Sequence, residues 1–114
     1  TALSPSGRRL YVAESADAAL VEIDTATGAV LGRASLAARG VLRPHAVTVT
    51  NDGDADDTDE SVVVADFFAR PRPGLARDQV EGFDDGKEGR VAFVSAATRA
   101  VTDVAVLSPM ASGF

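Results

Sequence analysis

Several residue types are missing or scarce in this chain of 114 residues, and each absence narrows its chemistry. There is no Cys, which excludes disulfides, thiolate metal sites and a Cys nucleophile. Trp is absent as well, Phe and Tyr together supply six residues, and His occurs once. No apolar run approaches the roughly 20 residues that a transmembrane helix needs. No basic, apolar leader follows Thr1, so we expect this sequence to be an excised piece, from which any export signal has been removed or in which it was never present.

The negative charge is concentrated in one short run. The formal net charge is −6, and six acidic residues without an intervening base lie between Asp52 and Glu60. The other acidic residues balance the 11 basic ones, nearly all of which are Arg. No basic field is present that could follow a nucleic-acid backbone, so we set that partner aside.

Short apolar runs bounded by turn-forming residues indicate β-strands. Residues 10–13, 20–23 and 29–36 fit this pattern, and residues 46–50 alternate apolar and polar side chains with many β-branched ones. The connection over residues 24–28 is predicted to be tight, because Asp and Thr side chains can bond backbone N–H groups and Gly28 permits positive φ. Residues 37–40 can form one helical turn, which Gly40 and Pro44 would stop.

The strand pattern recurs later in the chain with two interruptions. Gly7 recurs as Gly53, the run from residue 10 recurs from residue 62, and the segment from residue 24 recurs from residue 95. The spacing between equivalent residues therefore grows, which places insertions at about 54–60 and 70–89 of the second copy. The uninterrupted period of about 46 residues, four strands long, favours a propeller blade over a sandwich or a barrel.

Residues 3–13 (Leu-Ser-Pro-Ser-Gly-Arg-Arg-Leu-Tyr-Val-Ala) and 21–28 (Val-Glu-Ile-Asp-Thr-Ala-Thr-Gly) closely resemble the YVTN-type β-propeller repeat. The resemblance is weaker over 46–107, where Ser95 replaces the turn Asp and Arg99 the turn Gly, and we expect both replacements to loosen that connection. It implies an all-β fold in which residues 1–114 form a partial propeller of about two blades, each an antiparallel four-stranded meander. The first blade, 1–36, is expected to be incomplete, and the second covers 46–107. The family also implies a bacterial protein that is extracellular, on the cell surface or periplasmic.

The usual blade order of this family fixes where each insertion should lie. It assigns residues 46–50, 61–67, 90–95 and 100–107 to successive strands from the central channel outward. The acidic insertion then joins the first two strands. The insertion at 70–89 joins the second and third strands, and it falls on the same face as His45.

The acidic run is a candidate calcium loop. Acids at 52, 54 and 56 have the Asp-x-Asp-x-Asp spacing of such loops, and Ca²⁺ takes 6–8 oxygen ligands. It is not an EF-hand, because Asp57 replaces the invariant Gly and Val63 the bidentate Glu. It resembles the calcium loops of integrin-type propellers, with Thr50 where the first acid is expected; the alternative is a solvated hairpin tip. The candidate ligands are Asp52, Asp54, Asp56, Asp59 and Glu60.

The long insertion and the single His are two further candidate sites. Mixed charges in the insertion bind a polar ligand or pair internally, and loops of this length in compact domains tend to be functional or disordered. His45 resembles a His at the channel mouth of several propeller enzymes, where it can ligate metal or move protons; the alternative is a bond to a neighbouring blade's backbone. The candidate ligand-binding residues are His45, Arg70, Arg72, Asp84, Asp85 and Lys87.

No catalytic constellation is recognisable in the sequence. It contains neither a Gly-x-Ser-x-Gly elbow nor a phosphate-binding Gly-x-Gly-x-x-Gly, and Asp24 and Asp66 are predicted to be turn and strand-edge residues. The sequence therefore favours a non-catalytic scaffold segment that mediates binding. Its partners would be further blades of the parent chain and a protein or small polar ligand. The alternative is part of a propeller enzyme, a lactonase-like hydrolase or a haem-partnered oxidoreductase, with its site at the channel mouth.

Overall fold

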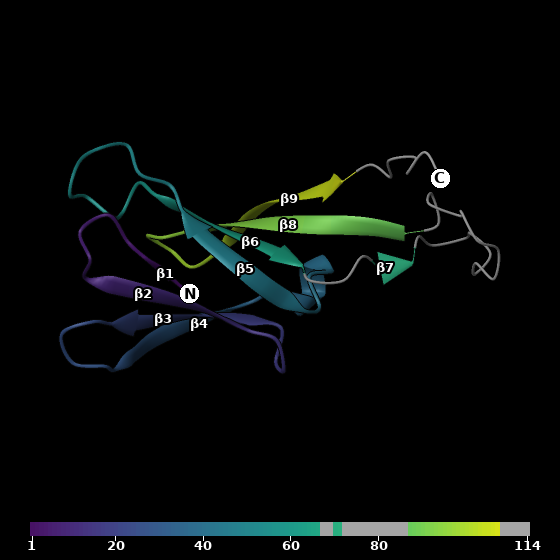
Figure 1. Cartoon of the computed structure of the whole chain (residues 1–114), viewed down its shortest axis with the longest axis horizontal. Coiled ribbons are helices and arrows are strands. Elements are labelled where there is room, and N and C mark those ends of the chain that lie inside the picture. Colours follow the sequence, from purple (N-terminus) through teal and green to yellow (C-terminus); the bar gives the residue numbers. More distant parts are fainter. Residues whose placement is uncertain (67–69, 72–86, 108–114) are drawn as a thin grey trace.

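A computed structural model describes residues 1–66, 70–71 and 87–107, and for residues 70, 71 and 87 it describes the backbone only. The described residues form β-strands and one 3-10 turn (Figure 1). Within those ranges, no helix is both long and apolar enough to cross a membrane.

The first sheet is an antiparallel meander of four strands. They are β1 (Ala2–Leu3), β2 (Arg9–Glu14), β3 (Ala19–Asp24) and β4 (Val30–Ser35), hydrogen-bonded in that order. The sequence pattern predicted the last three strands but not β1, whose two residues pair with Tyr11 and Leu10 of β2. Two residues are too few for an alternating pattern to be recognised.

The second sheet repeats this meander. Its strands β5 (Pro44–Val49), β6 (Ser61–Asp66), β8 (Lys87–Ser95) and β9 (Val101–Leu107) are antiparallel neighbours in that order. The short strand β7 (Arg70–Pro71) pairs with the beginning of β8, which explains why β8 starts earlier than the predicted strand at 90–95. The centre of the predicted insertion, residues 72–86, lies outside the described residues.

The β3–β4 and β8–β9 turns have the same backbone although their residues differ. Gly28 donates its N–H to the carbonyl oxygen of Asp24 at 2.8 Å, and Arg99 donates its N–H to that of Ser95 at 2.9 Å. Both donors have positive φ, 74° for Gly28 and 59° for Arg99. The expectation that Ser95 and Arg99 loosen the second turn is therefore wrong for its backbone geometry, because the same hydrogen bond closes it.

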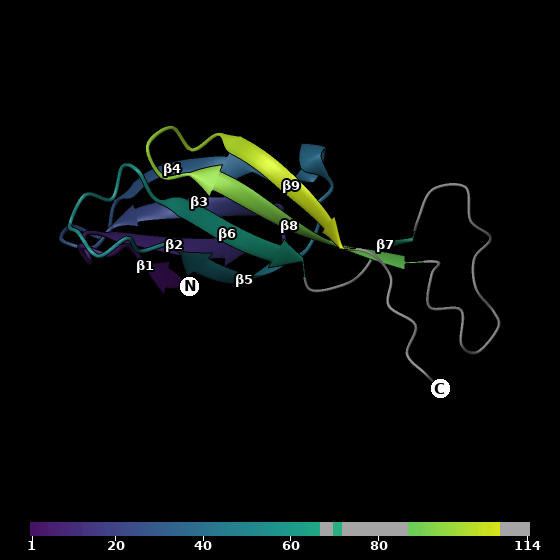
Figure 2. The same ribbon diagram turned by 90° about the horizontal axis from the view of Figure 1, so that it is seen from above.

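The two sheets pack face to face around one hydrophobic core. Side chains alternate across each strand, so each sheet turns one face to the core and leaves the other outside. The core residues are Tyr11, Leu20, Ala34, Leu36, Val41, Val62, Val64, Ala92 and Val94. In Figure 2, β1 and β5 lie along one edge of the pair of sheets and β4 and β9 along the other. This confirms the all-β fold of two stacked four-stranded meanders, the arrangement of two propeller blades.

The connection between the sheets closes one side of the core. It contains the 3-10 turn η1 (Ala37–Arg39), as the sequence predicted, and ends at Gly40 with φ of 82°. Leu36 and Val41 flank the turn and are fully buried. The Arg90 guanidinium donates to the carbonyl oxygen of Arg39 at 3.0 Å, which ties this connection to β8.

Candidate functional site

The meander topology sorts the sequence-predicted sites into two groups at opposite ends of the strands. The acidic loop at 51–60 lies at the same end as the turns that follow β3 and β8 (Figure 1). His45 near the start of β5, β7 and the start of β8 lie at the other end, because β5 begins where β6 ends. The long insertion therefore begins at the same end as His45, as the blade order implied.

Few details are described at the His45 end. The His45 side chain is exposed, Arg70 and Lys87 are placed by their backbones in β7 and β8, and Arg72, Asp84 and Asp85 lie outside the described residues. A ligand site formed by these residues stays a prediction.

Asp66 has the strand-edge role that the sequence predicted. Its carboxylate accepts the N–H groups of Arg43 at 2.6 Å and Leu42 at 3.3 Å, and so fastens the connection that enters β5 to the end of β6.

The acidic loop folds upon its own backbone. In successive Asx turns, a side-chain oxygen accepts the N–H group two residues later, at 2.8–3.1 Å. The pairs are Asn51 with Gly53, Asp52 with Asp54, Asp54 with Asp56, and Asp56 with Thr58. Hydrogen bonds from the Thr58 hydroxyl and N–H lower the pKa of Asp56. Backbone N–H donors thus stabilise one carboxylate oxygen of each of Asp52, Asp54 and Asp56.

Three of the five predicted calcium ligands converge. One oxygen of each of Asp52, Asp54 and Asp59 lies within 4.8 Å of the others, and all three residues are exposed. Partial desolvation and the charges of Asp52, Asp54 and Asp56 raise the pKa of Asp59, as expected for carboxylates held close together. Calcium binding by the five predicted ligands stays a prediction, and these three are the ones whose oxygens lie close together.

Calcium binding at this loop predicts a higher Tm in Ca²⁺ than in EDTA. The substitution Asp54→Asn should abolish this difference, and equal Tm values of the wild type in both solutions would contradict the prediction.

The other two predicted ligands, Asp56 and Glu60, lie outside this group of three. Asp56 accepts hydrogen bonds from Thr58. Glu60 is buried, accepts the Asp52 N–H at 3.0 Å and the Thr50 hydroxyl, and so closes the base of the loop.

Asp57 fastens the acidic loop to the first sheet. One carboxylate oxygen accepts the Ser6 N–H at 3.0 Å and the other accepts the Ser6 hydroxyl. Desolvation by itself would raise the pKa of Asp57, but the hydrogen bonds from Ser6 outweigh it and hold the pKa below its usual value. The residue that breaks the EF-hand pattern therefore joins the two sheets.

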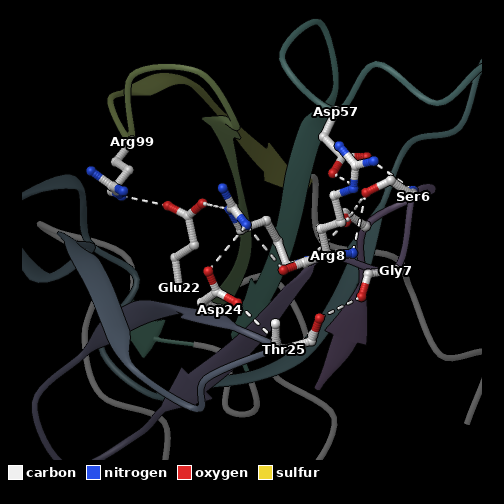
Figure 3. Close-up of polar contacts among 11 residues, drawn as sticks. Ser6, Gly7, Arg8, Glu22, Asp24, Thr25, Asp57 and Arg99 are labelled. Carbon is white, nitrogen blue, oxygen red and sulfur yellow. Dashed lines mark hydrogen bonds and ion pairs between the residues drawn. The ribbon is translucent and has the colours of Figure 1, made fainter.

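Glu22 is the centre of a second connection between the sheets (Figure 3). It lies on β3, is only 6% exposed, and pairs with Arg9 of the neighbouring strand at 3.3 Å and with Arg99 from the β8–β9 turn of the other sheet. The Arg99 side chain passes over Gly32, where a Cβ atom would lie 2.6 Å from its Nε. Glycine at position 32 thus leaves room for the inter-sheet ion pair.

A cavity of about 420 Å³ lies between the sheets at this end. The first sheet lines it with Arg8, Arg9, Tyr11, Glu22 and Leu31, and the second with Ala55–Thr58, Ala96, Ala97 and Arg99. Sequence reasoning missed it because its walls come from separate segments. The signals that could have found it were the two departures from the repeat, the acidic insertion and Arg99 in place of the turn Gly.

No protein-family model, curated protein or solved structure matches this chain. Function must therefore be inferred from the two sheets and from the groups between them.

Proposed function

We propose that this chain is a non-catalytic scaffold segment of a YVTN-type β-propeller, exported or carried on a bacterial surface. Its sheets bind further sheets of the same kind, and its loops face other partners. The supporting observation is that the two outer faces repeat the two faces that already pack together inside the chain.

The inner interface joins two different faces. The first sheet contributes Tyr11 and Leu20 of β2 and β3, and the second contributes Val62, Val64 and Val94 of β6 and β8. Such a head-to-tail interface does not close on itself. The outer face of each sheet therefore remains available to bind another sheet.

The outer faces carry the repeat-equivalents of these residues. In the sequence repeat, β2 is equivalent to β6 and β3 to β8, residue for residue. A residue on the inner face of one sheet is therefore equivalent to a residue on the outer face of the other sheet. On the second sheet the outer residues are Val63 and Val91, and on the first sheet Leu10, Val12 and Ile23. All of these are partly exposed. The second sheet also has a shallow, almost wholly apolar hollow of about 130 Å³ over β5 and β6.

The association of the purified chain tests this proposal. We expect concentration-dependent self-association in analytical ultracentrifugation, because the outer face of one copy fits that of the next. Val63→Glu places a charge in the apolar hollow and should weaken the association at least tenfold. Ala26→Glu adds the same charge to an exposed turn and should not. A cooperatively folded monomer at all concentrations, or equal effects of both substitutions, would contradict the proposal.

A further inference from the structure

The hydroxyl group of Tyr11 lies at the inter-sheet cavity and forms no hydrogen bond with a described residue. The residue is 3% exposed and belongs to the core, yet it lines the cavity. Within the described ranges no fully buried side-chain polar atom lacks a partner, so this hydroxyl must open onto the cavity. Burial, together with the charges of Glu22 and Asp57, raises the pKa of Tyr11 to about 12. The phenol is therefore neutral near pH 7 and has a hydrogen bond to donate.

Guanidinium groups supply further donors beside this hydroxyl. Arg99 contacts Glu22 through Nε, and among the described residues Glu22 is its one ion-pair partner. Arg8 also lines the cavity and forms no ion pair with a described residue. Because a guanidinium group has five N–H donors, both arginines retain donors for a ligand.

The carboxylates in the cavity wall are already engaged. Glu22 is paired with two arginines, Asp57 accepts two hydrogen bonds from Ser6, and Asp56 accepts two from Thr58. Both bonds to Asp56 end on Oδ1, so its Oδ2 remains an acceptor, but the Tyr11 hydroxyl and the guanidinium groups of Arg8 and Arg99 supply more free donors, and the cavity suits an acceptor. A carboxylate matches the planar guanidinium fork, whereas a phosphate dianion would be repelled about twice as strongly by Asp56 and Asp57.

The rest of the wall is apolar and built from small side chains. Leu31 comes from the first sheet, and Ala55, Ala96 and Ala97 come from the acidic loop and the β8–β9 turn. Charged and polar side chains make up more than half of the lining, and these four apolar residues offer a surface for the body of a bound ligand.

We propose that the cavity binds a small monocarboxylate with an apolar body, whose carboxylate is held by Tyr11, Arg8 and Arg99 and whose body lies against Leu31 and the three alanines. The site goes beyond the scaffold function and does not depend on it, because its walls lie between the two sheets and not on their outer faces.

Hexanoate is a suitable probe, with its uncharged isostere hexanamide and inorganic phosphate for comparison. Tyr11 is the only Tyr and Trp is absent, so tyrosine fluorescence of the chain reports on the cavity alone. We expect hexanoate to change this fluorescence saturably with a Kd on the order of 1 mM, and to raise the Tm. Hexanamide and phosphate should bind at least tenfold more weakly.

Two substitutions test whether hexanoate binds in this cavity. Its Kd is measured by calorimetry, because one of the substitutions removes the fluorescent Tyr11. Tyr11→Phe removes the donor without changing the shape of the ring, and Arg8→Gln removes a charge without touching the Glu22 ion pairs. Each should weaken hexanoate binding about tenfold, the value for loss of one hydrogen bond to a charged group. Arg33→Gln is the matched control, because Arg33 is exposed and pairs with Glu14 away from the cavity.

Four results would overturn the proposal. They are no saturable binding of hexanoate, equal binding of hexanamide, tighter binding of phosphate, and an equal effect of Arg33→Gln. The ultracentrifugation experiment is independent of all four, so failure of this site and failure of the scaffold proposal can be told apart.

Discussion

The β3–β4 and β8–β9 turns have the same backbone conformation and differ in the residue that adopts positive φ, Gly28 in the first and Arg99 in the second. Gly28 adopts positive φ without steric cost, and an added Cβ there would meet nothing within 4 Å. Arg99 adopts nearly the same φ at a cost of about 1 kcal/mol, since a side chain is disfavoured in this region. In return its guanidinium reaches Glu22 of the other sheet.

The difference shows how the two copies of the repeat divide their roles. Where the chain follows the repeat, it builds strands and turns. Where it departs from the repeat, at Arg99 and at Asp57 of the acidic loop, it connects the two sheets. The inter-sheet cavity lies between these two departures.

The largest effect is expected when Glu22 loses its carboxylate. Glu22→Ala should lower the free energy of unfolding by about 2 kcal/mol, because two arginines lose a buried partner that joins the sheets. Glu14→Ala is the control, since Glu14 pairs with Arg33 inside the first sheet at a more exposed position and should cost less than about 1 kcal/mol. Urea unfolding measures both. Equal losses would mean that the inter-sheet pair adds nothing.

Substituting the positive-φ residue should have different consequences in the two turns. Gly28→Ala should cost about 1 kcal/mol, because a side chain enters the positive-φ region and makes no new contact. Arg99→Gly should be nearly neutral in thermal unfolding, because relief of the same strain offsets the lost ion pair. A loss at Arg99 as large as at Gly28 would show that backbone strain is not the compensating factor.

A methyl group at position 32 should break the ion pair between Arg99 and Glu22, because it would occupy the space of the Arg99 side chain. Gly32→Ala places a Cβ against the Arg99 side chain, which can move aside but then leaves Glu22. We expect a loss of about 1 kcal/mol, typical of a partly exposed charged hydrogen bond. In an Arg99→Gly background the same substitution should cost clearly less, and an unchanged cost there would point to strand backbone as the cause.

The smallest change at neutral pH is expected for Tyr11→Phe, whose effect belongs to alkaline solution. The pKa of Tyr11 is raised from 10.0 to about 12, so the fold favours the neutral phenol. The unfolded chain ionises first as pH rises, and this contribution to stability is lost between pH 10 and 12. The wild type should therefore lose more stability than Tyr11→Phe in this interval. Absorbance titration of the single Tyr gives its pKa directly, and an unshifted pKa would contradict the buried placement.

The sequence allowed most strands, their order and the blade architecture to be predicted, because apolar runs and turn residues recur at a measurable period. The contacts between the sheets were beyond that reasoning. Arg99 and Glu22 are 77 residues apart, and neither residue type indicates the other. The spacing of the acidic loop likewise suggested five ligands, but it did not show which of them converge or that Glu60 accepts hydrogen bonds at the base of the loop, because both depend on the path of the backbone.

The central claim is that residues departing from the repeat hold the two sheets together, and a double-mutant cycle on Glu22 and Arg99 tests it most directly. Unfolding free energies of the wild type, Glu22→Ala, Arg99→Gly and the double variant give the coupling between the two side chains. The structure predicts a coupling of about 1 kcal/mol or more in favour of the pair. Effects that add to within about 0.3 kcal/mol would show that the two sheets are held by their apolar faces alone.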